Sequence, residues 1–244
     1  MSAGVNCFTF LNELQMAISI LGHGHPKLLF QEITHRIYSE ESYYGLRRDL
    51  FLSFDSPAAR VPLQIRPLRA GDIPKLFKKN KEGFNEIDLK NLLQRNLLLK
   101  SGIPMCYVAT VGNDEPCYMQ WLIGPQHNED LLRYYRGGFP PLGPDEMLLE
   151  GAFTPTLYRG LGIMSSAMAK IAEKGESLGA RRIITFVKND NDGALKGSKR
   201  AGFLPFTMRT SQWRYFRRRL NFIPLSPILG GNVVKMPKVF RSGQ

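Results

Sequence analysis

The sequence has little cysteine and no long apolar run. Its three cysteines, Cys7, Cys106 and Cys117, are an odd number and lack the CxxC or Cys/His spacing of metal ligands. A disulfide framework and a structural zinc site are therefore disfavoured, and we expect reduced thiols. No apolar run reaches the roughly 18 residues of a membrane span, and residues 1–20 lack the basic start and cleavage site of a signal peptide. We therefore expect a cytoplasmic protein.

Acidic residues are scarce at one end of the chain. The 244 residues include 33 Lys and Arg against 21 Asp and Glu, a net charge of +12, and residues 201–244 contain no acidic residue. A basic segment of this kind attracts anionic partners: nucleic acid, anionic lipid, a nucleotide cofactor or an acidic carrier protein. Charge alone leaves these four open. The hydrophobic share of 43% is ordinary for a globular protein, so we expect a packed core.

The expected secondary structure mixes helices and strands in an informative order. Residues 1–60 show helical spacing of apolar residues, and a Pro-containing break follows. A Gly-Asn dipeptide at 112–113 predicts a hairpin between two strands. The later elements are a strand at 63–66, helices at 72–79 and 85–102, strands at 105–111, 116–123 and 147–153, a helix from 163, a strand at 182–187, a helix at 192–200 and strands from 203. This order predicts an α+β fold.

A glycine-containing turn joins the expected strand at 147–153 to the helix from 163. Its sequence is Arg159-Gly160-Leu161-Gly162. Glycines allow a sharp backbone turn, the amides of a helix N-terminus point into one concavity, and Arg159 adds a full charge. The turn is therefore suited to a phosphate group, although a tight strand-to-helix connection without a ligand would use the same residues.

Three separated motifs together resemble the GNAT superfamily of acyltransferases over residues 63–206. They are Ile65-Arg66-Pro67-Leu68 with Asp72-Ile73, the glycine turn, and Asn191-Asp192-Gly193-Ala194-Leu195 leading to Ala201-Gly202-Phe203. The resemblance implies a mixed, mostly antiparallel central sheet flanked by helices. It divides the chain into an N-terminal helical extension (1–60), a GNAT acyltransferase domain (61–222) and a basic C-terminal tail (223–244).

The resemblance also implies a site for acetyl-coenzyme A or another acyl-coenzyme A. The family binds the pyrophosphate at a Q/R-x-x-G-x-G/A turn, which Arg159 and Gly162 match, whereas Met164 replaces the last small residue and leaves less room. The pantetheine arm is expected in a splay between residues 150–154 and 185–188. The expected cofactor-binding residues are Phe153, Thr154, Arg159, Gly160, Leu161, Gly162, Ile163, Met164, Ser165 and Asn191. For Asn191, an N-cap is an equal alternative.

Transfer of an acyl group to an amine needs a base and a proton for the leaving thiolate. Glu150, on the expected fourth strand of the family fold, is the candidate base, and a structural salt bridge is its alternative role. Ser198 stands where many relatives of the family carry a tyrosine acid, and serine is a poor acid. Tyr158 or Tyr215 could serve instead, water could protonate the thiolate, or catalysis could be lost. We expect an active enzyme.

Two further patterns have less specific interpretations. His23-x-His25 offers only two ligands, so we expect no metal. Residues 213–219, Trp-Arg-Tyr-Phe-Arg-Arg-Arg, interleave aromatic and basic side chains. This pattern occurs where proteins stack bases or bind anionic surfaces, and also in the charged edge strand of a sheet, which is the interpretation we favour.

These observations rank three functions. The first is an N-acyltransferase that uses acetyl-coenzyme A or a related thioester on a small amine, amino acid or amino sugar. The second keeps the fold but takes its acyl group from an acyl carrier protein, as in enzymes that resemble N-acyl amino acid synthases. The third is a nonenzymatic module that binds nucleic acid or a membrane through residues 209–241, which we rank last.

Overall fold

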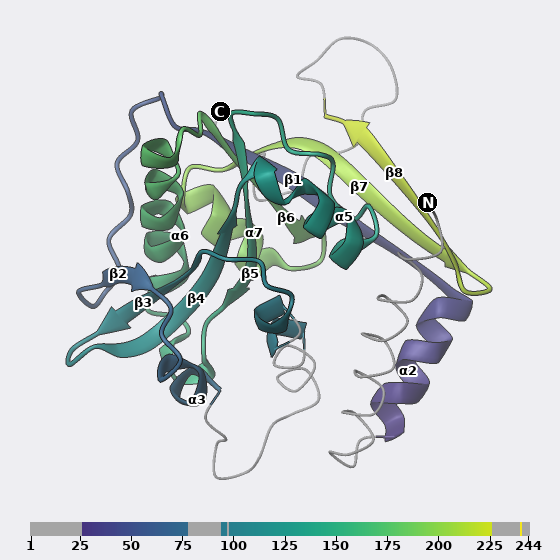
Figure 1. Cartoon of the computed structure of the whole chain (residues 1–244), viewed down its shortest axis with the longest axis horizontal. Helices are drawn as coiled ribbons and strands as arrows, with labels where there is room; N and C mark the ends of the chain where they lie inside the picture. The colour runs from purple at the N-terminus through teal and green to yellow at the C-terminus, as the bar shows by residue number, and fades with distance from the viewer. Residues whose placement is uncertain (1–25, 78–93, 97, 226–239, 241–244) are drawn as a thin grey trace.

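The computed structural model describes residues 26–77, 94–96, 98–225 and 240, and they form one eight-stranded sheet with helices on both faces (Figure 1). The strands lie in the order β2-β3-β4-β5-β6-β1-β7-β8, and only β5 and β6 are parallel neighbours. Their bounds are β1 (Tyr38–Asp49), β2 (Gln64–Pro67), β3 (Cys106–Val111), β4 (Glu115–Ile123), β5 (Glu146–Phe153), β6 (Arg182–Lys188), β7 (Leu204–Arg214) and β8 (Arg217–Pro224). The expected mixed, mostly antiparallel sheet is confirmed.

Five α-helices and three short 3-10 helices accompany the sheet in the described residues. The α-helices are α2 (Pro26–Ile37), α3 (Asp72–Leu76), α5 (Asn128–Tyr135), α6 (Ile163–Lys174) and α7 (Asp192–Arg200). The 3-10 helices are η1 (Pro125–His127), η2 (Thr156–Tyr158) and η3 (Glu176–Leu178). Residues 94–96 and 98–100 are also helical. The rest of the helix expected at 85–102 lies largely outside the described residues.

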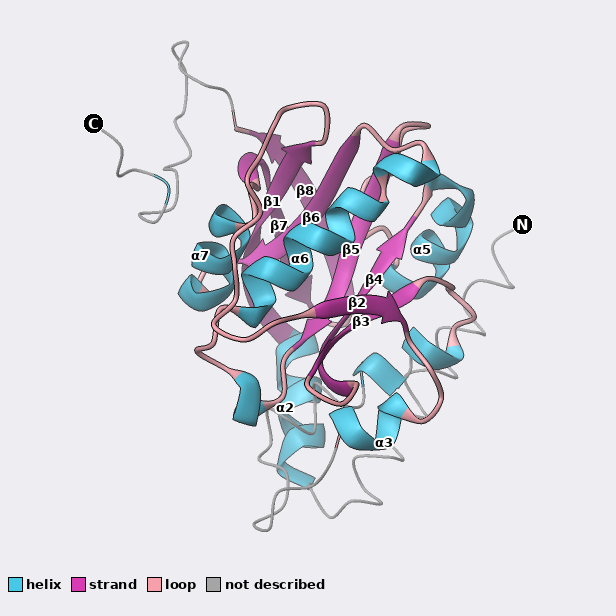
Figure 2. Cartoon of the chain, turned by 90° about the vertical axis from the view of Figure 1, so that its left-hand side faces the viewer, coloured by secondary structure: helices cyan, strands magenta, loops and turns pink. Residues whose placement is uncertain are grey.

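The alternation of side chains along the strands divides the core into two layers. Leu149 of β5 and Ile183 of β6 pack with α6 and α7 on one face. Leu148 and Ile184 pack on the other face with α3 and α5. Figure 2 shows α6 crossing in front of the sheet, with α5 toward its edge. Successive residues of β5 therefore point into different environments, and the even-numbered side chains of its middle lie on the α5 face.

Strand β1 is the main departure from the expected elements. We expected residues 1–60 to be helical, and α2 agrees, but residues 38–49 form a long strand. The strand pairs antiparallel with β6 on one side and with β7 on the other. It contains three Tyr but no Val, Ile or Thr, and its many charged and polar residues give a weak strand pattern, so that pairing with two neighbours decides its conformation.

Most of the other expected elements are present. The hairpin of β3 and β4, the helix α6 and the strand β6 lie where the sequence predicts them. Helix α5 was not expected, although Glu129 and Asp130 in its first turn are a usual signal of a helix start. No helix among the described residues is long and apolar enough to span a membrane.

Candidate functional site

The strands β5 and β6 diverge after three residue pairs. Their parallel pairing joins Glu146–Leu148 to Arg182–Ile184 and goes no further. The rest of β6 continues to pair with β1 on its other side, up to Lys188 opposite Tyr43. The second half of β5 therefore has no strand partner on its β6 side. This is the splay that the sequence predicts at residues 150–154 and 185–188.

A β-bulge at Gly151 reshapes β5 in the splay. The register of β4 against β5 shifts between Met119 and Trp121, and Gly151 has a φ of +70°. A Cβ at this position would lie 2.7 Å from Cε3 of the buried Trp121, so only glycine fits. The splay is not entirely open, because the carbonyls of Gly151 and Ala152 accept hydrogen bonds from Arg95. These two groups, which we expected to be unpaired, are occupied.

The glycine turn leaves a set of amides available before α6. Gly160 and Gly162 have φ values of +81° and +75°, and Gly162 is the residue before the helix. The first amide that donates within this region is that of Ser166, to the Gly162 carbonyl at 3.2 Å. Within the part of the chain that the structure describes, the amides of residues 160–165 have no acceptor. They are oriented by a helix N-terminus, where partial positive charge favours an anion.

The side chain of Met164 does not crowd this turn as its size suggested. It packs between α6 and α7, so that a Cβ at Gly197 would lie 3.1 Å from Met164 Sδ. The segment at residues 58–60 runs past the turn instead. The amide of Arg60 donates to the Leu161 carbonyl at 2.9 Å, and Ala59 Cα lies 3.6 Å from where a Cβ of Gly162 would be.

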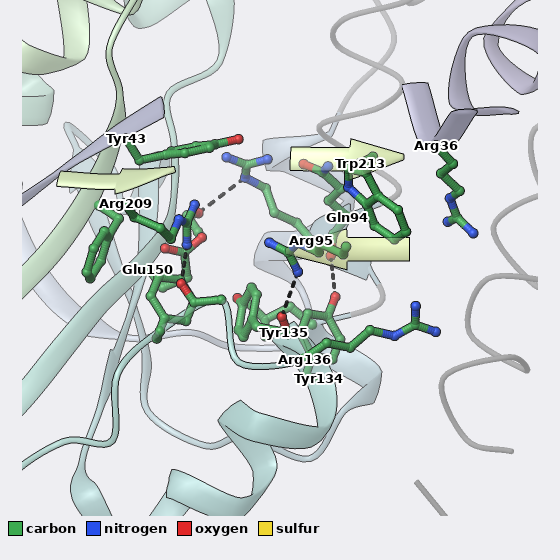
Figure 3. Close-up of a pocket in the computed structure, with 16 residues that line it drawn as sticks. Arg36, Tyr43, Gln94, Arg95, Tyr134, Tyr135, Arg136, Glu150, Arg209 and Trp213 are labelled. Atoms are coloured by element: carbon green, nitrogen blue, oxygen red, sulfur yellow. Dashed lines mark hydrogen bonds between the residues drawn. The ribbon is translucent and has the colours of Figure 1, made fainter. Parts of the chain in front are cut away.

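A cavity of about 460 Å³ lies on the α5 face of the splay (Figure 3). Its walls come from α2, β1, α5, β5, β6, β7, β8 and the helical residues near 95, so segments far apart in the chain contribute to it. Five arginines line it, and among its described lining Glu150 is the single acidic residue. The lining includes Tyr43, Arg95, Tyr134, Tyr135, Phe139, Glu150, Phe186, Arg209, Trp213 and Arg218.

Glu150 reaches the cavity from β5 immediately before the bulge. Burial raises the pKa of its carboxyl group above the usual glutamate value, while the Gly151 amide and the charges of Arg209 and Arg95 partly offset that rise. No Lys or Arg of the described residues forms an ion pair with it. The sequence allowed a structural salt bridge as the alternative role of Glu150. Such a bridge is absent among the described residues, and the carboxyl group faces the cavity.

The other expected catalytic residues lie away from Glu150. Ser198 is fully buried, with its hydroxyl 3.7 Å from Met168 Sδ between α7 and α6, so it has a packing role. Tyr158 lies in η2, beyond the end of β5. Burial raises the pKa of its hydroxyl group, and Glu115 and Cys117 near the start of β4 raise it further. Neither residue lines the cavity. The structure brings only Glu150, of these three, to the cavity.

The remaining cofactor candidates are distributed around the turn. Asn191 is the N-cap of α7, because its Oδ1 accepts from the Ala194 amide at 3.0 Å. Phe153 stacks near Phe77, with ring centroids 5.1 Å apart. The Thr154 carbonyl accepts from Arg159 Nε at 3.1 Å, which ties the arginine to the end of β5.

Sequence reasoning missed most of the cavity walls. Tyr43, Arg95, Tyr135, Arg209 and Arg218 come from segments far apart in the chain. The basic aromatic stretch at 213–219 was noticed and forms the end of β7, a turn and the start of β8, the edge strand of the sheet. Side chains alternate between the two faces of a strand, and this alternation could have identified Arg218. It turns the Arg218 side chain inward and leaves residues 217 and 219 exposed.

The segment with the splay, Glu150 and the glycine turn also matches a known family. Residues 105–203, from the start of the β3 region to the end of α7, match the family model described as acetyltransferase (GNAT) family. This segment is therefore similar to GNAT acetyltransferases. The matched segment contains β3 to β6 with α5, α6 and α7, whereas the cavity walls from β1, β7 and β8 lie outside the matched range.

Several solved structures are similar to this chain at low sequence identity. The glucosamine N-acetyltransferase region of a fungal multi-domain GH3 β-N-acetylglucosaminidase is 14% identical, with a TM-score of 0.52, over 82% of this chain and 23% of that one. A GCN5-related N-acetyltransferase from Sphaerobacter thermophilus is 11% identical, with a TM-score of 0.46, over 84% and 58%. A Drosophila protein is 13% identical, with a TM-score of 0.43, over 83% and 57%. This chain therefore spans less than two thirds of each.

At these identities the likeness to the fungal region shows the fold alone. A comparison of the sequence with curated proteins finds no match. Among the described residues, no group of three or more His, Cys, Asp or Glu side chains converges as metal ligands would. His23 and His25 lie outside the described residues.

Proposed function

We propose that the chain is an N-acyltransferase that moves an acetyl or other acyl group from a coenzyme A thioester to the amine of a small molecule. The observation that carries this proposal is the position of β5. Its second half has no strand partner toward β6, carries Glu150 at a cavity on one face, and leads directly into the glycine turn. A GNAT domain match over the same segment supports acyl transfer.

The residues of the turn and the splay fit an acyl-coenzyme A. The amides of residues 160–165, at the N-terminus of α6, would hold the diphosphate, and Arg159 would add charge beside it. The side of β5 without a strand partner would hold the amide-containing arm in the manner of an added strand, through main-chain groups other than the Gly151 and Ala152 carbonyls that Arg95 occupies. When bound, this group supplies an activated acyl carbon with a thiol as its leaving group. Asn191 is not part of this set, because its side chain caps α7.

Glu150 is the proposed general base. An amine must lose a proton to become acylated, and a carboxylate at the cavity can take that proton directly or through one water. Burial moves the pKa of Glu150 upward, which brings a carboxylate closer to the range where it both holds and releases a proton near neutral pH. No side-chain acid is included, since neither Ser198 nor Tyr158 lines the cavity.

Calorimetric titration with acetyl-coenzyme A tests the donor site. The variant Gly162→Ala places a side chain at φ +75° in the turn, and Gly179→Ala places one at φ +87° after η3, where nothing lies within 4 Å. Both variants carry similar backbone strain, but only the first changes the amides before α6. We expect roughly tenfold weaker binding for Gly162→Ala and unchanged binding for Gly179→Ala, because amide orientation sets these hydrogen bonds. Absence of binding by the unmodified protein would contradict the proposal.

Mass spectrometry of a panel of amines tests the reaction. The panel contains amino acids, simple amines and amino sugars, incubated with the protein and several acyl thioesters, with acyl carrier protein as a donor in a parallel arm. We expect the mass gain of one acyl group on one class of amine with acyl-coenzyme A. Transfer from the carrier protein alone would replace the proposed donor, and no mass gain on any amine would reject acyl transfer.

A further inference from the structure

The cavity beside Glu150 contains two arginines whose charges are offset by Glu150 and Glu41 only from a distance, without a direct ion pair. Arg209 and Arg218 both line it, from β7 and β8. Neither guanidinium forms an ion pair with an acidic side chain in the described ranges. Glu41, the other nearby carboxylate, is bound by Lys188 at 3.2 Å and accepts from the Tyr43 hydroxyl at 3.1 Å.

Two arginines elsewhere in the described residues pair with acidic side chains. Arg48, which is 5% exposed, pairs with Glu173 at 3.1 Å. The partly buried Arg66 binds Asp72 at 2.6 Å. Arg209 is 7% exposed and has no such partner, although burial makes an uncompensated charge costly. Among the described residues, the two buried arginines therefore differ in that only Arg48 has an acidic partner.

Arg209 is held in place by groups that leave its charge intact. Its guanidinium lies 4.0 Å from the ring centroid of Tyr43 and 5.2 Å from that of Phe186, and Nη1 donates to the Gly138 carbonyl. Its Nε is buried without any hydrogen-bond partner among the described residues. An aromatic cage of this kind positions a planar cation but does not neutralise it.

Arg218 adds a second charge close to the first. Its Nε donates to Ser211 Oγ and its Nη1 to the Tyr135 carbonyl, each at 3.1 Å, so neutral groups orient it as well. Burial lowers the pKa of Arg218, and the positive charge of Arg209 lowers it further. Two like charges held together by neutral partners are stabilised by an anion between or beside them.

We infer that Arg209 and Arg218 form an anion subsite for the acceptor, and that the acceptor is an amine bearing a carboxylate, as in an amino acid. The inference rests on the proposed acyl transfer and adds the class of acceptor. Arginine forks match a carboxylate in two parallel hydrogen bonds, and Glu150 lies in the same cavity to serve the amine. The aromatic walls formed by Tyr134, Tyr135, Phe139 and Trp213 can contact an apolar side chain.

The cavity has the size and chemistry for such a molecule. Its volume of about 460 Å³ is in the range of small-molecule sites, and its lining combines aromatic side chains with convergent polar and charged groups. A simple amine would leave both guanidinium groups without a bound anion and would add a further positive charge to a cavity that five arginines already line. An amino sugar without an acidic group would do the same. The carboxylate is therefore the feature that distinguishes the acceptors.

Matched acceptors test the inference. Phenylalanine, phenylalaninamide and phenethylamine share an aromatic side chain and an amine, and only the first has a carboxylate. In 1-amino-2-phenylethylphosphonic acid a phosphonate replaces the carboxylate of phenylalanine. The kcat/KM for each is measured from release of the coenzyme A thiol. We expect phenylalanine to exceed its amide and amine by about a hundredfold, because a site built for a polar group rejects analogues that lack it. A preference for the phosphonate would move the assignment from carboxylate to phosphorus oxyanions.

Variants on β8 separate the anion subsite from general effects. Arg218→Gln should raise the KM for phenylalanine at least about tenfold and reduce the preference over phenethylamine, since a charged fork is lost. Arg219→Gln, next along β8 and exposed on the other face, is the matched control and should change neither. Arg209→Lys, which keeps the charge but loses the fork, should act like Arg218→Gln if it folds.

A binding measurement distinguishes failure of this inference from failure of the proposed function. Thermal protection by phenylalanine, and not by phenylalaninamide, is expected without any thioester and should be lost in Arg218→Gln. Equal acylation of all three aromatic acceptors would overturn the anion subsite and keep acyl transfer. Absence of acylation with protection by phenylalanine would overturn acyl transfer and keep the subsite. Absence of selective protection would overturn the subsite in either case.

Discussion

Gly151 shows how one residue shapes both the sheet and the site. Its positive φ coincides with the bulge, which begins directly after Glu150, the last residue of β5 in regular register with β4 before the shift. The indole of Trp121, 1% exposed, fills the space where a side chain would be. The position is thus restricted twice, by backbone conformation and by packing.

The variant Gly151→Ala should lower the free energy of unfolding by about 3 kcal/mol, because a left-handed conformation and an overpacked ring each cost about 1–3 kcal/mol. Urea denaturation measures the change. The control Gly71→Ala, at φ −68° with nothing within 4 Å, should be neutral or slightly stabilising. A change below about 0.5 kcal/mol in Gly151→Ala would show that the bulge is not fixed by this residue.

Glu150→Gln should separate stability from activity. Because the pKa of Glu150 is raised in the folded protein, the native state holds its proton more tightly than the unfolded chain does. The carboxylate therefore destabilises the fold as pH rises above the ordinary glutamate pKa, and the effect becomes constant above the raised pKa. The melting temperature of Glu150→Gln relative to the unmodified protein should increase from pH 4 to pH 8, as differential scanning fluorimetry would record.

The same variant should lose about two orders of magnitude or more in kcat/KM near neutral pH, which is the usual contribution of a general base. In the unmodified protein, activity should rise with pH through the raised pKa of Glu150, and this acidic limb should be missing from the residual activity of Glu150→Gln. A variant with unchanged kcat/KM would remove Glu150 from the mechanism and leave the stability prediction intact.

At the scale of residues, the sequence identified Glu150 and the glycine turn as candidate site residues because each is defined by its neighbours in the chain. Glu150 lies in a recognisable strand, and the turn is four consecutive residues. Arg209 and Tyr43 could not be predicted as neighbours, since their contact depends on the register between β1 and β7. Local patterns contain no information on that register when β1 itself has only a weak strand pattern.

The turn between β7 and β8 connects the edge of the sheet to the end of helix α2. Its two turn residues, Tyr215 and Phe216, have φ values of +48° and +63°, and both side chains are largely exposed. Their amides donate to the carbonyls of Ile37 and Arg36 at 2.8 Å, at the C-terminal end of α2. The turn thus satisfies terminal carbonyls of a helix that lies beside β1 and β7, as Figure 1 shows.

Replacing the turn by Tyr215→Asn with Phe216→Gly should raise the free energy of unfolding by about 1 kcal/mol, because Asn-Gly adopts two positive φ angles with little strain. Both amides remain, so the contact with α2 is kept. The pair Tyr215→Ala with Phe216→Ala removes the rings and retains the strain, and chemical denaturation should show no gain for it. A loss of stability in the Asn-Gly variant would mean that the aromatic rings themselves contribute.

The sequence predicted the elements of the GNAT domain well because their boundaries carry local signals. Asn191 caps α7, glycines flank α6, and Gly112 lies in the β3–β4 turn. Helix α5 was missed, although acidic residues in its first turn were available as a signal. The edge strand β8 follows from its charged residues, as expected for a strand with one open side.

On the scale of the whole molecule, β1 joins the two ends of the chain. It lies between β6 and β7, so the GNAT domain match and the C-terminal hairpin meet through an N-terminal strand. The division of the chain at residues 60 and 222 remains a prediction, and β1 belongs to the same sheet as the strands of the segment that matches the GNAT model. A resemblance based on motifs at 63–206 could not include this strand, because it lies before them.

A chain that begins at residue 51 should therefore fail to fold cooperatively. Without β1, the main-chain groups of β6 and β7 that now pair with it would be exposed, and β7 and β8 would lose their connection to the sheet. Near-UV circular dichroism and a thermal scan would show loss of fixed aromatic signals and of a single transition. A cooperative transition in the shortened chain would show that residues 51–244 form an independent domain.

The location of β1 also constrains how the protein is made. A ribosome synthesises this strand long before either of its neighbours, β6 and β7. The nascent segment must stay unpaired, or be protected by a chaperone, until both neighbours have been made, because contacts between distant parts of a chain form late and slowly. Expression yield should therefore depend on chaperone supply.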